Sequence, residues 1–140
     1  METLLPLKRL LPALALPLVV AACGGGDEPE STTFVFRLHG HPETQEFRAT
    51  TDSPEVIAAA RAQLALPVEE RRLFPNGPIA AGSGGVNAPW SWHYENFELA
   101  EMTIELCDGW PGLVESDLPY WLNTVKTFCP WSGYVHAEAD

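Results

Sequence analysis

Alternating apolar and polar residues predict two strands at the start of the folded part of the chain. Residues 34–38 have the sequence FVFRL and place every second side chain on one apolar face, which is the period of a half-buried strand. A polar turn region follows at 39–45, and residues 46–51 resume strand character. The simplest structure for this pattern is a β-hairpin.

The clearest helix signal covers residues 54–66. Ser53 is a typical N-cap residue, Pro54 suits the first helical position, and Glu55 lies at the positive end of the helix dipole. Pro67 ends the helix. The apolar positions at helical spacing are Val56, Ile57, Ala60 and Leu64.

Three further apolar segments predict strands. Residues 71–81 contain two prolines, which favours a short or edge strand. Residues 90–94 alternate strictly and place three aromatic side chains on one face. Residues 97–106 form a longer predicted strand with a bulge near Ala100, because the apolar frame shifts there. The residues expected to point inward are Phe97, Leu99, Met102, Ile104 and Leu106.

The carboxyl-terminal part predicts a helix and a last strand. Residues 111–122 have a helical apolar face and should bend at Pro119, and residues 129–135 form the last strand. The fold class is therefore α+β, with a mainly antiparallel sheet of about six strands in the order ββα-βββ-α-β and two helices. The inward residues of the helix are Leu113, Val114, Leu118, Trp121 and Leu122.

The first 22 residues have the layout of an export signal. A short basic segment precedes an apolar run that is too short and too rich in proline to span a bilayer. The sequence Val-Ala-Ala-Cys at 20–23 resembles the lipobox of bacterial lipoproteins, with Val20 where leucine is commoner. The resemblance implies a signal peptide at 1–22 and acyl groups on Cys23, and several acyl chains anchor a protein firmly.

Residues 23–33 lack an apolar run and are rich in Gly, Pro, Ser and acid, so we expect a flexible tether there. A single domain at 34–140 follows. The predicted location is the bacterial cell envelope, lipid-anchored at the periplasmic face or the outer membrane. An accidental cysteine in an ordinary secretory signal is the alternative.

The charge balance excludes one class of partner. The chain without residues 1–22 contains six Lys or Arg residues and 18 Asp or Glu residues. Such a surface repels nucleic acid and would steer a cationic partner toward itself. Acidity also keeps small exported proteins soluble, which is the simpler interpretation.

Cysteine use fits export. If Cys23 is lipidated, Cys107 and Cys129 remain in an oxidising compartment, where a disulfide is the expected state. This bond would close a loop that contains the second predicted helix.

Several motifs together resemble a family of small exported bacterial domains, largely uncharacterised. The motifs are PWSWHY, the run from Phe97 through CDG to Glu115, FCPWSGYV, and EFRATTDSPEVI upstream. The family is similar to the amino-terminal domain of a social-amoeba calcium-binding protein associated with membranes. The resemblance covers roughly residues 34–138. It implies the same fold and the same disulfide. The family has no established activity to carry over, and the resemblance gives only a weak indication that the domain binds calcium.

The turn Asp108-Gly109-Trp110 is the candidate partner-binding or calcium-binding site. Asp108 and Gly109 could supply oxygen ligands, but the twelve-residue acidic calcium loop is missing, so we favour a helix-cap role for Asp108. We expect Trp110 to be exposed, whereas Trp90 and Trp92 belong to the core. The glycine-rich loop at 82–87 is a second place for a partner.

Two histidine motifs are weaker candidates. His39 and His41 could bind a metal but lack further ligands at a fixed spacing, so a polar turn is preferred. Ser91 and His93 share a strand face without an identifiable acid or oxyanion hole. We therefore assign no catalytic residue, no metal ligand and no required cofactor.

The predicted function is non-enzymatic binding by a lipid-anchored domain, with the membrane and a protein of the envelope as partners. An inhibitor of a secreted hydrolase, such as lysozyme or a protease, is the alternative, because an acidic domain could block a cationic enzyme. The second alternative is a small hydrolase that uses His93.

Overall fold

The first sheet confirms the predicted hairpin. The computed structural model describes residues 30–140, so the signal peptide, Cys23 and most of the tether lie outside the described residues. Strand β1 (Thr32–Leu38) pairs antiparallel with β2 (Phe47–Thr51) on one side and with β7 (Gly133–Glu138) on the other. The short helix η1 (Glu43–Gln45) lies between β1 and β2. The last two residues of the predicted tether belong to β1, where the Thr33 and Thr50 hydroxyls lie 2.6 Å apart.

Helix α1 (Pro54–Leu64) forms where the sequence predicts it. The Ser53 hydroxyl accepts a hydrogen bond from the Val56 N–H at 3.3 Å, and Pro54 opens the helix. Val56, Ile57 and Ala60 are buried, so the predicted apolar face is confirmed. The chain continues through η2 (Val68–Glu70) to the second sheet.

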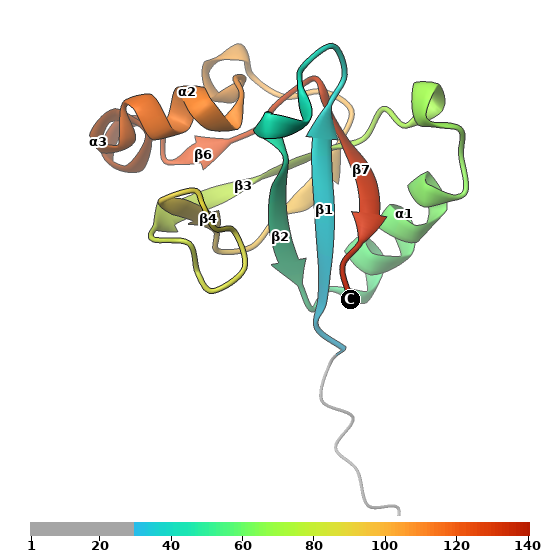
Figure 1. Ribbon diagram of the computed structural model, residues 1–140. Helices are drawn as coiled ribbons and strands as arrows, with labels where there is room; N and C mark the ends of the chain where they lie inside the picture. Colours follow the sequence, from blue (N-terminus) through green and yellow to red (C-terminus); the bar gives the residue numbers. More distant parts are fainter. Residues whose placement is uncertain (1–29) are drawn as a thin grey trace, which may run out of the picture.

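The second sheet is built on β3 (Phe74–Ala81), which crosses behind the first sheet (Figure 1). The prediction of a short or edge strand is wrong, because three short strands pair antiparallel with β3. Each partner pairs with only two or three residues of β3, so a proline removes at most one bond from each short ladder. The three partners are β4 (Trp92–Tyr94), β5 (Glu98–Ala100) and β6 (Thr127–Phe128).

Aromatic side chains fill the space between the two sheets. Phe47 of β2 lies within ring-contact distance of Trp92, Tyr94 and Phe128 from the second sheet. Trp92 and Phe128 are fully buried, with ring centroids 5.2 Å apart in an edge-on arrangement. The predicted core position of Trp92 is confirmed. Trp90 packs at the margin, where its indole N–H donates to the Glu46 carbonyl at 2.8 Å.

The predicted long strand at 97–106 is wrong after Ala100. Strand β5 ends there, and the chain continues without regular structure to the short helix η3 (Glu105–Cys107). Of the residues that were expected to point inward, Phe97 is buried and Leu99 packs against the core, whereas the last three are exposed, namely Met102 (87 %), Ile104 (71 %) and Leu106 (59 %). The reason is that β3 begins at Phe74, which pairs with Ala100, so no strand remains for residues 101–106 to pair with.

The second helical region is divided into short pieces. Helix α2 (Pro111–Ser116) ends at Asp117, and α3 (Leu118–Tyr120) passes into the π-helical turn η4 (Trp121–Val125). The predicted bend therefore lies at Asp117, because Pro119 fits the first turn of a new helix and cannot continue the previous one. Val114 and Trp121 are buried as predicted.

The predicted last strand at 129–135 is wrong in its bounds. Residues 129–132 form a turn between β6 and β7, in which the Gly133 N–H donates to the Pro130 carbonyl at 2.8 Å. This turn carries the chain from the second sheet to the first, which one continuous strand could not do. The α+β class with antiparallel pairing is confirmed, and the seven strands found within residues 30–140 form two sheets.

Candidate functional site

The disulfide is confirmed and fixes the segment after β5. Cys107 and Cys129 are bonded and both are buried. Their backbones also meet, because the Cys129 N–H donates to the Cys107 carbonyl at 2.8 Å. The Thr103 hydroxyl donates to Cys129 Sγ at 3.1 Å. Residues 101–107 are therefore attached to the turn that follows β6 by a covalent bond and by hydrogen bonds.

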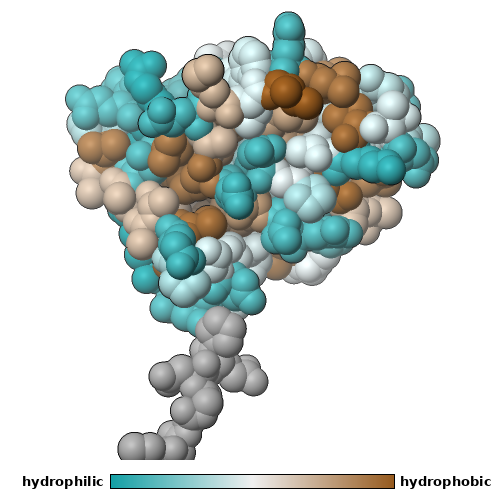
Figure 2. Space-filling model, turned by 180° about the vertical axis from the view of Figure 1, so that it is seen from behind, coloured by the Kyte–Doolittle hydropathy of each residue, from teal (hydrophilic) through white to brown (hydrophobic). Residues whose placement is uncertain are grey.

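Four exposed apolar side chains gather on this segment, and we call them the ledge. Its members are Met102, Ile104, Leu106 and Trp131. Trp131 is 44 % exposed, and its indole N–H donates to the Thr103 hydroxyl at 2.7 Å. Figure 2 shows apolar surface at the end of the domain farthest from the start of β1. Large apolar side chains that are exposed side by side mark an interaction surface more often than single ones do.

Two hollows flank the ledge. One, of about 410 Å³, is lined by Met102, Ile104 and Leu106 on one side and by Val125 and Thr127 on the other. The second, of about 640 Å³, lies between Met102 and Trp131 and reaches His39 and Arg72. The ledge thus has one hollow along its side and another between Met102 and Trp131, and both could receive side chains of a binding partner.

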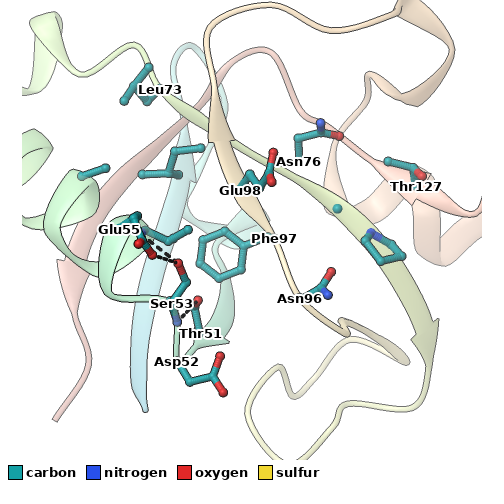
Figure 3. A pocket seen from close by; sticks show the side chains of 15 residues that line it. Thr51, Asp52, Ser53, Glu55, Leu73, Asn76, Asn96, Phe97, Glu98 and Thr127 are labelled. Atoms are coloured by element: carbon teal, nitrogen blue, oxygen red, sulfur yellow. Dashed lines mark hydrogen bonds between the residues drawn. The ribbon is translucent and has the colours of Figure 1, made fainter. Parts of the chain in front are cut away.

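A larger groove of about 920 Å³ lies between the start of α1 and strands β3 and β5. Figure 3 shows Asp52 and Glu55 on the helix side and Glu98 with Phe97 on the strand side. The residues that line the groove include three carboxylates and no Lys or Arg. Asn76 and Thr127 line both this groove and the smaller hollow, so the groove and the ledge adjoin.

The close approach of β3 and β5 beside the groove requires glycine at position 77. A Cβ on Gly77 would overlap the backbone carbonyl of Asn96 and lie 2.9 Å from the Cα of Phe97. Any larger residue would push the Asn96–Phe97 segment away from β3. The floor of the groove therefore depends on this one residue.

The predicted site at Asp108-Gly109-Trp110 adjoins the ledge. Asp108 Oδ1 accepts hydrogen bonds from the Gly109 and Trp131 N–H groups, both at 2.8 Å. Asp108 is therefore no helix cap, because Trp110 precedes α2 and makes no side-chain cap bond. Its carboxylate instead fixes the backbone of Trp131. Trp110 is 42 % exposed, as predicted, and lies beside His41 with ring centroids 5.9 Å apart.

The loop at 82–87 and the predicted serine–histidine pair are held by other contacts. The Ser91 hydroxyl donates to Glu115 Oε1 at 2.8 Å, whereas His93 Nδ1 lies 2.8 Å from the Gly82 carbonyl oxygen. Gly84, with a φ of +63°, lies against the His93 ring. Ser91 and His93 are thus each occupied by a different partner, and His93 supports the loop.

His39 and His41 separate rather than converge on one point. His39 Nε2 lies 2.9 Å from the Arg71 carbonyl oxygen, and its ring stacks on Tyr134. Within residues 30–140, no group of three or more His, Cys, Asp or Glu side chains is placed to hold a metal ion. The same residues contain no helix that has both the length and the hydropathy for crossing a membrane.

Shifted pKa values lie away from the ledge. Burial lowers the pKa of His136 in β7, and burial raises the pKa of Tyr94 well above its usual value. The hydrogen bond from Arg61 lowers the pKa of Glu138. These shifts belong to the core and to the β7–α1 contact, so they indicate structural roles.

Charge is distributed unevenly between the two halves of the domain. Residues 73–125 contain seven Asp or Glu residues and no Lys or Arg. The ion pairs found in the described residues involve only Arg37 and Arg61. Three of the four ledge residues and most of the strand side of the groove therefore lie in a part of the chain whose acidic residues have few cations to compensate them.

The ledge and the groove were missed by the sequence interpretation, which placed Met102, Ile104 and Leu106 in a strand. One signal was present, because a strand with two apolar frames cannot bury both on one face. The groove combines α1 with β3 and β5, so its members are distant in the sequence and share no local pattern.

Residues 30–140 match a family model, which describes the N-terminal domain of the protein BP-74. No curated protein and no solved structure matches the chain significantly. The matched range includes both sheets, the disulfide, the ledge and the groove. The chain therefore belongs to the BP-74 N-terminal domain family.

Proposed function

We propose that this chain is a non-enzymatic binding domain that a lipid on Cys23 holds at the bacterial cell envelope. The observation that carries the proposal is the ledge, whose most exposed member, Met102, is 87 % accessible. A domain that buries most of its large aromatic residues in the core has no structural need to expose these side chains. A surface for a partner accounts for them.

The position of the ledge fits a tethered domain. The described chain enters β1 at Thr32, and β1 has seven residues, which span about 20 Å. His39 follows β1 and lines the hollow beside the ledge. A tether that begins at Cys23 would therefore hold the opposite end of the domain near the membrane and direct the ledge away from it.

Affinity capture tests binding. The bait is residues 23–140 with Cys23→Ser, which removes the lipid site, and the prey is an envelope extract. A stable partner is expected, and repeating the capture with calcium and with a chelator separates a calcium-assisted complex from an independent one. Absence of any specific partner under both conditions would contradict the proposal.

Metabolic labelling tests the anchor. A radioactive fatty acid is expected to label the full chain and not the Cys23→Ala variant. An unlabelled wild-type chain would refute lipid anchoring and leave an ordinary exported domain.

An inhibitor of a cationic secreted hydrolase is a second candidate, and the absence of Lys and Arg from residues 73–125 favours it. A complex of this kind forms quickly and weakens with salt, because exposed charges are screened. Lysozyme and trypsin activity with and without the chain provides the test. Unchanged activity of such enzymes at micromolar concentrations of the chain would argue against inhibition.

A further inference from the structure

We propose that the ledge and the adjoining groove bind a cationic amphipathic segment of a partner protein. This inference rests on the proposed binding function and specifies the chemistry of the partner. The apolar face of the segment would cover the ledge, and its Lys or Arg side chains would meet the carboxylates around it.

The apolar half of the argument comes from exposure. Met102, Ile104 and Leu106 are 87, 71 and 59 % exposed, and they line one side of a hollow of about 410 Å³. Covering these side chains with the apolar face of a partner removes apolar area from water, which favours association. The three residues and Trp131 together offer the apolar contact that one face of a segment needs.

The second step concerns how firmly the ledge is held in place. The disulfide holds Cys107, Trp131 is fixed through its indole to Thr103, and the Trp131 N–H donates to Asp108. The ledge is thus held in place before a partner arrives. A partner loses little binding free energy in ordering it.

The third step concerns charge. Glu101 and Glu105 alternate with the ledge residues along the chain, and both are exposed. Glu98 lines the groove together with Asp52 and Glu55. Two cations lie nearby, namely Arg72 in the second hollow and Lys126, which stands between Val125 and Thr127 of the first hollow. This distribution is complementary to a cationic segment and repels an acidic one.

A lipid surface fits less well. Anionic headgroups attract basic side chains, whereas the chain around the ledge is acidic. The ledge also lies at the end of β1 opposite the predicted tether, so the membrane that holds the anchor is not the surface that the ledge faces.

A pair of designed helical peptides tests the inference. Both have about 18 residues, roughly five turns, and the same leucine face. One carries lysine on its polar face and the other carries glutamate. Fluorescence anisotropy of the labelled peptide measures its binding to residues 23–140 with Cys23→Ser. We expect the lysine peptide to bind, with an affinity that falls as salt rises from about 0.05 to 0.5 M, and the glutamate peptide to bind at least about tenfold more weakly.

Variants locate the site. Met102→Ser with Ile104→Ser should lower the affinity for the lysine peptide by about tenfold or more. Glu101→Gln with Glu105→Gln should reduce the salt dependence of that affinity. Tyr120→Ser is the matched control, because Tyr120 is also a large exposed side chain (43 %) but lies on α3 outside the ledge and groove. All five substituted positions are exposed, and circular dichroism with a thermal melt verifies the fold.

The inference is overturned if the two peptides bind equally or if the ledge variant binds like the wild type. It is also overturned if the ledge variant loses binding to phosphatidylcholine vesicles while neither peptide binds the wild type. A partner captured equally by the wild type and the ledge variant would leave the proposed function in place and refute the site. If no partner is captured and no peptide binds, both the proposed binding function and this inference fail.

Discussion

Loss of the Cys107–Cys129 disulfide is expected to destabilise the domain by about 3 kcal/mol and to loosen the ledge. The perturbation is Cys107→Ala with Cys129→Ala in the chain from residue 23 that also carries Cys23→Ser. Alanine is suitable because both positions are buried beside Phe74 and a hydroxyl there would need a new partner.

The magnitude follows from the length of the closed loop. The two cysteines are separated by 22 residues. In the chain-entropy description, a loop of this length changes the free energy of unfolding by about 3 kcal/mol at room temperature. The loop contains α2, α3 and η4, so the bond restricts a large part of the second half of the domain in the unfolded state.

Urea unfolding followed by tryptophan fluorescence measures the effect. For a denaturant slope of about 1.5 kcal/mol per molar, typical of a domain of this size, the midpoint should fall by about 2 M. The wild-type chain under reducing conditions is an independent comparison and should give a similar decrease. A midpoint within about 0.5 M of the oxidised wild type would show that the disulfide does not hold this half of the fold.

The remaining predictions concern single residues, each measured by the midpoint of urea unfolding. Burial lowers the pKa of His136, so the unfolded chain binds a proton at this residue more readily than the folded chain does. The resulting contribution to stability is present above pH about 6.5 and is lost below it. His136→Gln should therefore reduce the loss of stability between pH about 7.5 and 5.5, and an unchanged dependence of stability on pH would contradict this. Gly77→Ala should cost about 3 kcal/mol or more, because its Cβ meets the Asn96 carbonyl, and a stability equal to wild type would mean that β3 and β5 can separate without cost. Arg71 donates to the backbone carbonyls of four residues, so Arg71→Lys should cost about 2 kcal/mol; a cost within about 0.5 kcal/mol would show that these bonds are replaced by water.

Local patterns in the sequence were enough for the first half of the fold. The β1–β2 hairpin follows from alternation, and α1 follows from Ser53, Pro54 and an apolar face at helical spacing. The disulfide follows from the number of cysteines in a chain that the sequence predicts to be exported. Each of these features depends on neighbouring residues or on composition, which a single sequence contains.

Features that depend on distant pairing could not be read in this way. The two prolines of β3 suggested an edge strand, but β3 is central because its partners are short and come from residues 92–100 and 127–128. Met102 and Ile104 have the alternation of a strand, yet they lack a partner strand beyond Ala100. The length of β3 decides which apolar residues pair with another strand, and the residue types themselves do not.

The candidate site also depends on contacts between residues that are distant in the sequence. Asp108 was chosen for a local role at a helix start, whereas its carboxylate bonds to Trp131, 23 residues later. The ledge exists because the disulfide holds residues 101–107 beside the turn that follows β6. The sequence motif was therefore in the correct region, and tertiary contacts determine which of its side chains face a partner.

Photo-crosslinking in cells can show whether the ledge of the anchored protein contacts a partner. A photoreactive amino acid replaces Ile104 in the full chain with its native Cys23, and a second version carries it at Tyr120 as the control. We expect a protein adduct from position 104 that is weak or missing from position 120 and that is lost when Cys23→Ala removes the proposed lipid anchor. Equal adducts from the two positions, or none from position 104, would contradict a tethered domain that binds a partner through the ledge.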